Sequence, residues 1–128
     1  MGNDVDVRFA AAAAIGREAG LLARRLFDDG VAVALKSRQD YVTRADAEVE
    51  ALIRQRLGSL FPDDAIVGEE MGGAARARTW IIDPIDGTAN FAHRHTNYAV
   101  SIAFVEDLEP TIGVVHLPAT DVLYTALR

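Results

Sequence analysis

The end of the chain contains three apolar runs of strand length, separated by short connections rich in turn residues. The runs are YAVSIAFV (98–105), TIGVVHLP (111–118) and VLYTAL (122–127), and the connections are EDLEP and PATD. Apolar runs of this length, bounded by proline and acidic turn residues, are typical of neighbouring antiparallel strands. The sequence therefore predicts an antiparallel meander at this end of the chain.

Two longer segments near the start have the apolar spacing of helices. The first, 5–27, ends at the Asp-Asp-Gly sequence 28–30. Its apolar positions are Ile15, Ala19, Leu22 and Leu26. The second, 40–58, has Thr43 as a candidate N-cap and Gly58 as a candidate C-terminal stop. Its apolar face is formed by Val49, Leu52, Ile53 and Leu57. We therefore predict two N-terminal helices.

Three further segments are predicted to be strands. They are VAVALKS (31–37), AIVGEE (65–70) and TWII (79–82), and a turn or loop follows each. Helices followed mainly by strands predict an α+β fold, in which two N-terminal helices pack on a mostly antiparallel sheet. No internal repeat or linker interrupts residues 1–128, which we interpret as one domain.

Composition excludes several functional classes. The net charge of -6 argues against a nucleic-acid-binding surface, which needs clustered Lys and Arg. The chain has no cysteine, so it can hold no disulfide, thiolate zinc site or cysteine nucleophile. No apolar run approaches the ~18 residues of a membrane span, and the alanine-rich start lacks the features of a signal peptide. We expect a cytoplasmic protein without nucleic-acid or membrane partners.

The stretch WIIDPIDGTANF, residues 80–91, sets two aspartates directly after an apolar strand. Two unit charges about 4 Å apart repel by roughly 4 kcal/mol at the effective dielectric of a protein surface. Asp83 and Asp86 on one tight turn are therefore unfavourable unless a cation lies between them. Pro84 stiffens this turn, because its ring fixes φ. The motif predicts a metal site.

Further acidic residues are expected at the same site. We predict Asp46 in the first turn of the second helix and Glu69 just after the apolar residues AIV (65–67). Oxygen ligands alone favour a hard cation such as Mg²⁺, which binds a few carboxylates and keeps waters and phosphate oxygens. The carbonyl of Ile85 is a further candidate ligand. After it, residues 87–88 begin a short helical turn whose free N–H groups could hold a phosphate.

Each of these fragments also has a purely structural interpretation. Asp46 with Thr43 could form a helix cap, Glu69 and Glu70 could be a solvated strand end, and DPIDG could be an ordinary turn. Their occurrence together favours a metal site. Other motifs are absent: the chain has no phosphate loop, no dinucleotide fingerprint and no nucleophile elbow around Ser101. His93, His95 and His116 lack the spacing of metal ligands, and we expect His116 to be a structural residue of a strand.

The segments DYVTRAD (40–46), VGEE (67–70) and WIIDPIDGTANFAHR (80–94) together resemble the inositol monophosphatase family of Mg²⁺-dependent, lithium-sensitive phosphatases. The resemblance extends over essentially the whole chain. It implies the first half of a layered αβαβα fold, two or three Mg²⁺ ions in a complete site, a small phosphorylated alcohol as substrate, and a homodimer.

The resemblance also implies a role for each residue of the site. Glu69, Asp83 and the carbonyl of Ile85 would bind one Mg²⁺, and Asp83 would bridge to a second ion held also by Asp86. Three residues would act on the attacking water in catalysis: Asp46, Thr88 and Glu69. The N–H groups of Gly87 and Thr88 would bind the substrate phosphate. Glu70 matches an acid with a less direct role, and Lys36 lies where some members place a lysine.

Family members are commonly about twice as long, with a second α/β half that supplies another aspartate for the second metal. The resemblance therefore implies that residues 1–128 are an N-terminal domain and that the C-terminal half is absent from this sequence. The implied reaction is hydrolysis of inositol monophosphate to inositol and phosphate. Related sugar and histidinol phosphates remain open as substrates. The alternative is a truncated, catalytically incomplete association module.

Overall fold

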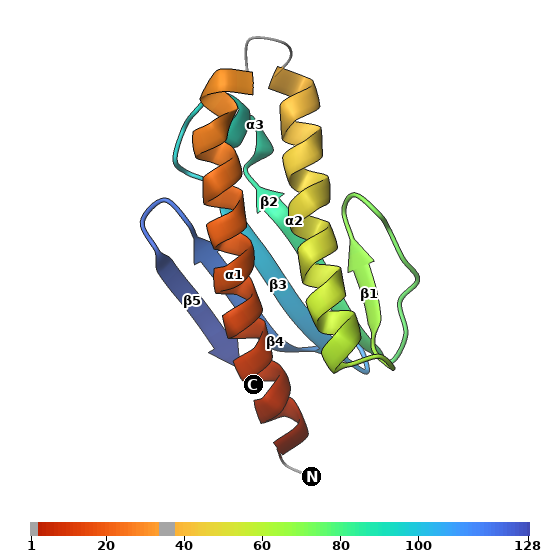
Figure 1. Ribbon diagram of the computed structural model, residues 1–128. Coiled ribbons are helices and arrows are strands. Elements are labelled where there is room, and N and C mark those ends of the chain that lie inside the picture. Colours follow the sequence, from red (N-terminus) through yellow and green to blue (C-terminus); the bar gives the residue numbers. More distant parts are fainter. Residues whose placement is uncertain (1–2, 34–37) are drawn as a thin grey trace.

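The computed structural model describes the backbone of residues 3–33 and 38–128 and the side chains of residues 4–29 and 44–128. Two long helices, α1 (Asn3–Val33) and α2 (Arg38–Leu60), lie side by side on one face of a five-stranded sheet (Figure 1). The strands are β1 (Ala65–Gly68), β2 (Arg78–Asp86), β3 (Ala99–Glu106), β4 (Glu109–Leu117) and β5 (Val122–Leu127). A short helix, α3 (Thr88–Ala92), follows β2.

The sheet has the strand order β1-β2-β3-β4-β5. From β2 to β5 each strand pairs antiparallel with the next, whereas β1 runs parallel to β2. The predicted α+β class and the antiparallel meander are confirmed. The sheet is mixed because a long connection, residues 69–77, returns the chain to the start of β2 and so allows a parallel pair.

Three predicted elements have wrong boundaries: the first helix, the strand after it and the second helix. The strand expected at 31–37 does not begin at Val31, because α1 continues through residues 28–30 to Val33; residues 34–37 of that prediction lie outside the described part. A glycine inside a helix costs only about 1 kcal/mol relative to alanine, which packing can outweigh. Helix α2 begins at Arg38, so Thr43 is not its N-cap, and it passes Gly58 to end at Leu60.

The core lies between the two helices and the sheet. Strand residues Trp80, Ile82, Val100, Ile102 and Phe104 alternate with more exposed neighbours and are buried against the helices. At one end of this core Trp80 packs against Phe104, with ring centroids 4.7 Å apart. No helix in the described residues is both long and apolar enough to span a membrane.

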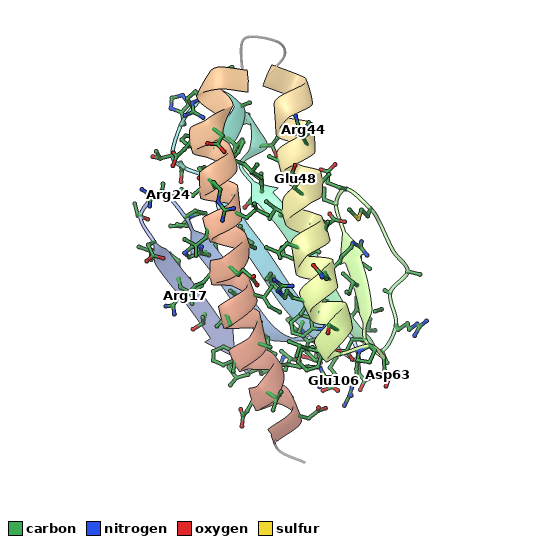
Figure 2. All side chains as sticks on the ribbon, viewed as in Figure 1. Arg17, Arg24, Arg44, Glu48, Asp63 and Glu106 are labelled. Carbon is green, nitrogen blue, oxygen red and sulfur yellow. The ribbon has the colours of Figure 1, made fainter. Side chains whose placement is uncertain are left out.

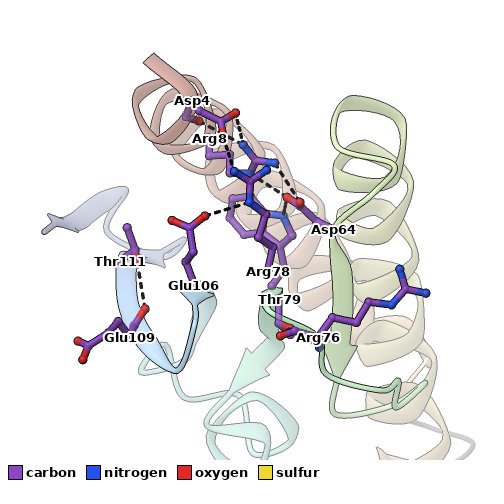
Figure 3. Close-up of polar contacts among 10 residues, drawn as sticks. Asp4, Arg8, Asp64, Arg76, Arg78, Thr79, Glu106, Glu109 and Thr111 are labelled. Atoms are coloured by element: carbon purple, nitrogen blue, oxygen red, sulfur yellow. Dashed lines mark hydrogen bonds and ion pairs between the residues drawn. The ribbon is translucent and has the colours of Figure 1, made fainter. Parts of the chain in front are cut away.

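A buried ion pair joins the start of α1 to the turn before β1 (Figure 3). Arg8 donates through Nε and Nη2 to the two carboxylate oxygens of Asp64, over 2.8 and 2.9 Å. The indole N–H of Trp80 donates to the same carboxylate over 3.0 Å. The Asp64 carboxylate raises the pKa of Arg8 above its ordinary value. These contacts fix α1, the 61–64 turn and β2 relative to one another.

Candidate functional site

Strand β2 continues through the motif that was expected to follow it. Asp83 pairs with Ser101 and Asp86 with Ala99, and the register shifts between these two pairs. The irregularity contains Pro84, which lacks the N–H that a regular ladder would use, and prolines within sheets are confined to such positions and to edges. The aspartates are therefore presented from an irregular strand end and not from a turn beyond the strand.

Asp46 lies well inside α2, not in its first turn as the sequence predicted. It is 6% exposed, and its Oδ1 is buried without a hydrogen-bond partner among the described residues. Burial, followed by the charges of Glu70, Asp83, Glu69 and Glu50, raises the pKa of Asp46 to about 7. Helix α2 packs on β2, and this packing brings Asp46 to the acidic end of that strand.

Asp83 is half-buried, and its Oδ1 is likewise buried without a hydrogen-bond partner in the described part of the chain. Burial and the neighbouring Glu69 carboxyl, with a further contribution from Asp86, raise the pKa of Asp83 to about 7. The fold thus brings together Asp46, Glu69, Asp83 and Asp86, the four acids that the sequence selected. Two of these carboxyls, Asp46 and Asp83, have raised pKa values, and perturbed pKa values of this kind cluster at functional sites.

Glu69 and Glu70 are exposed and lie in the short loop between β1 and Gly72. The loop is closed by two backbone hydrogen bonds between Gly68 and Gly72, of 3.0 and 2.9 Å. Beneath it lies Glu50 of α2, which is fully buried and accepts hydrogen bonds from the N–H groups of Glu70 and Met71. Sequence reasoning missed Glu50; the signal was a charged residue between the apolar positions Val49 and Ile53.

The turn into α3 depends on two residues of the motif. Gly87 has φ 89°, a left-handed conformation that favours glycine, and an added Cβ would lie 2.9 Å from the Asn97 carbonyl oxygen. The Thr88 hydroxyl donates to the Ile85 carbonyl oxygen over 3.0 Å. That oxygen retains a second lone pair, so its expected role as a metal ligand is compatible with this bond.

Aromatic side chains pack against α3 and hold it in place. Phe91 of α3, Phe27 of α1 and Tyr98 form a cluster with ring centroids 5.0 to 5.3 Å apart. A surface pocket of about 380 Å³ begins at Asp86 and Gly87 and is bordered by Asn90 and Asn97. Space for a small polar ligand therefore adjoins the acidic strand end.

The acidic group has the donor atoms for a metal ion, although its side chains are not already arranged around one. The described residues contain no group of three or more His, Cys, Asp or Glu side chains already arranged to hold one. The donor set nevertheless suits a hard cation, because buried, unpartnered carboxylate oxygens on Asp46 and Asp83 are surrounded by further carboxylates. A cation would satisfy the Asp83 oxygen, a water bound to that cation would satisfy the Asp46 oxygen, and the positive charge would offset the repulsion.

The lysine, the histidines and the serine named from the sequence are not part of the acidic group or lie outside the described residues. Lys36 lies outside the described residues. His116 is buried in β4 and pairs with Asp121, with 2.9 Å between its Nε2 and the Asp121 Oδ1, which agrees with a structural role. His93 and His95 are exposed residues after α3, and Ser101 lies within β3.

The family model described as the inositol monophosphatase family matches residues 4–128. The inositol-1-monophosphatase of Rhizobium meliloti is 43% identical over a region that covers 75% of this chain and 37% of that protein. The histidinol-phosphatase of Mycobacterium tuberculosis is 46% identical over 68% of this chain and 34% of that protein.

The crystal structure of inositol monophosphatase-II from Staphylococcus aureus superposes with a TM-score of 0.85 at 31% identity, covering 94% of this chain and 46% of that one. The chain spans less than half the length of the curated relatives that it matches. The matched region includes every segment that carries the resemblance, and the fold agrees over nearly the whole chain. The chain therefore belongs to the inositol monophosphatase family.

Proposed function

We propose that this chain is the N-terminal α+β domain of a Mg²⁺-dependent phosphatase that hydrolyses phosphate monoesters, with inositol monophosphate as the preferred substrate. The observation that carries the proposal is the pair of buried, unpartnered oxygens on Asp46 and Asp83, set among carboxylates at the end of β2. Membership of the family supports the reaction class. The length of the relatives supports a C-terminal α/β half beyond this domain.

In this proposal Glu69, Asp83, Asp86 and the Ile85 carbonyl would hold Mg²⁺, with two or three ions in the complete site. Bound metal would supply an activated water and stabilise the leaving oxygen. Asp46 acts as general base through Oδ1, which is buried beside the proposed metal ligands and has no hydrogen-bond partner among the described residues. Glu69 assists in orienting the same water.

Thr88 has a second role at this site. Its hydroxyl donates to Ile85, which leaves its lone pairs free to accept a hydrogen bond from the attacking water and so to orient it. The N–H groups of Gly87 and Thr88 bind the phosphate of the substrate. The left-handed Gly87 supports this assignment, because it lets the backbone turn sharply beside Asp86.

The substrate class is small phosphorylated alcohols. Related sugar and histidinol phosphates are the competing substrates, because relatives of this chain are named for fructose-1,6-bisphosphatase and histidinol-phosphatase activities as well as for inositol monophosphate hydrolysis. Phosphate release from these three substrate types, measured with a form of the protein that contains the further half, tests the choice. Fastest turnover of inositol monophosphate, inhibited by lithium, is expected; preference for another ester would overturn the substrate assignment.

A specific observation favours self-association as a second function. The sheet face opposite the helices has exposed apolar side chains, among them Ile81 (49% exposed), Val115 (36%) and Tyr124 (59%). Such a face is typical of an interaction surface, and β5 is an edge strand. We propose a cytoplasmic homodimer, which sedimentation at several protein concentrations tests. A monomer at every concentration would contradict it.

A further inference from the structure

Glu50 presents an electrostatic problem that the proposed function does not solve. Its side chain is fully buried in α2, although its charge adds to those that raise the pKa of Asp46. A buried charge is costly unless it is paired and hydrogen-bonded. A buried carboxylate close to an already acidic group must therefore have specific stabilising partners, and its presence there calls for a functional explanation.

Both oxygens of Glu50 are occupied by partners from outside its own turn. Oε1 accepts the N–H of Glu70 over 2.9 Å, and Oε2 accepts the N–H of Met71 over 2.9 Å. Arg54, one turn further along α2, donates through Nε to Oε2 over 2.9 Å and through Nη2 to the Gly72 carbonyl oxygen. The pair thus contacts the 69–72 loop at three backbone groups.

Only a carboxylate fits this position. A glutamine has the same shape, but its amide would direct N–H groups at one of the two loop N–H groups, leaving a buried donor unsatisfied. Gly68 leaves room for the Glu50 carboxylate, because an added Cβ at position 68 would lie 2.4 Å from Oε2 of Glu50. The sequence of the loop and the charge in the helix are therefore fitted to each other.

We propose that Glu50 is a positioning residue, which fixes the backbone of residues 69–71 so that the Glu69 carboxylate is held beside Asp83. The inference rests on the proposed function, since it treats Glu69 and Asp83 as metal ligands. Arg54 neutralises the buried carboxylate and ties the far end of the loop. Residues that orient metal ligands commonly change metal affinity 10- to 100-fold when substituted, although they do not touch the metal.

The test is the affinity of the 128-residue chain for Mn²⁺, measured by electron paramagnetic resonance of the free ion, at a temperature where circular dichroism shows each variant folded. Glu50→Gln is expected to weaken binding about 10- to 100-fold. Glu48→Gln is the matched control (Figure 2): it removes a charge from the same helix, and the Glu48 side chain is 47% exposed beside Arg44. Its affinity should be unchanged.

Hydrogen exchange in the metal-free chain gives a readout that does not depend on the metal. The amides of Glu70 and Met71 should exchange slowly in the unsubstituted chain and fast in Glu50→Gln. Gly68→Ala displaces the carboxylate without changing any charge and should reproduce both effects; Gly58→Ala, where an added Cβ meets nothing within 4 Å, is its control. These variants keep the proposal testable if Glu50→Gln does not fold.

The two possible failures are distinguishable. If the unsubstituted chain binds Mn²⁺ and both Glu50→Gln and Gly68→Ala retain that affinity, Glu50 has a structural role only and this inference is overturned while the proposed function stands. If the unsubstituted chain binds no Mn²⁺, the metal assignment itself is overturned, and the positioning role with it.

Discussion

At the scale of single residues, the chain keeps two carboxyl groups in an environment that favours their neutral form. Asp46 and Asp83 each have a pKa of about 7, mainly because burial disfavours the charged state. A cation at this site would reverse that preference. Protons and metal ions therefore compete for the same oxygens, and metal binding should weaken as the pH falls below about 7.

The first prediction concerns stability without metal. A carboxyl whose pKa is raised from 3.8 to about 7 binds a proton more tightly in the folded chain, so the free energy of unfolding decreases as the pH rises from about 4 to about 7. Asp46→Asn should remove part of this decrease and stabilise the chain at pH 8 more than at pH 5. Urea unfolding with a chelator at both pH values measures the effect. An unchanged pH dependence in Asp46→Asn would contradict the assignment.

The second prediction separates a ligand from its neighbour. Asp83→Asn should weaken divalent-ion binding more than Glu70→Gln does, because Asp83 is a proposed metal ligand with a buried, unpartnered oxygen, whereas Glu70 is exposed and is not a proposed ligand. At pH 8, above the pKa of about 7 of Asp83, both substitutions remove a negative charge from the same acidic group, so the general electrostatic effect is matched. Isothermal titration calorimetry with Mn²⁺ gives the two affinities. Equal losses would show that overall charge, and not ligation by Asp83, holds the ion.

At the scale of elements, the site depends on the docking of α2 against β2 and on the anchoring of α1 at the opposite end of the sheet. The anchor is the buried Arg8–Asp64 pair with the Trp80 indole. Arg8 also packs over the ring of Phe61, 4.6 Å from its centroid. The anchor contains no proposed ligand, which makes it a test of stability alone.

The third prediction is made for this anchor. Asp64→Ala should lower the free energy of unfolding by about 3–5 kcal/mol, because it leaves the buried Arg8 charge without its main partner. Glu106→Gln is the control: it breaks the exposed pair with Arg78, where an effect of only about 0–1 kcal/mol is expected. Chemical denaturation compares the two. Similar small losses would mean that Arg8 finds another partner or is hydrated.

The sequence predicted which helices and strands form better than it predicted the residues at which they begin and end. The meander was identifiable because its strands are short, apolar and separated by turn residues. The predicted strand at 31–37 was wrong from its first residue, because α1 extends to Val33. An alternation of apolar residues over so few positions does not distinguish a strand from the last turn of a helix. The acids of the site were identifiable from the motif, but Asp46 was placed in a first turn, because the start of α2 at Arg38 has no strong local signal. Glu50 was missed, because its partners are backbone N–H groups that no motif encodes.

At the scale of the whole molecule, the proposed metal site and an exposed apolar sheet face belong to the same α+β fold. The helices cover one face of the sheet (Figure 1). The apolar side chains exposed on the other face include Ile81, Val115 and Tyr124. The proposed first metal has its ligands within this domain: Glu69, Asp83 and the Ile85 carbonyl. The proposed second metal has only Asp83 and Asp86, so the domain alone should hold it loosely.

The most direct test of the account is a Mg²⁺ or Mn²⁺ titration of the purified 128-residue chain at pH 8, followed by an inositol monophosphate assay at saturating metal. We predict that the chain binds one ion weakly and releases negligible phosphate. No binding of either ion would contradict the metal site. Turnover near ~1 to 10 s⁻¹, ordinary for an enzyme, would contradict the proposal that this domain needs a further half for catalysis.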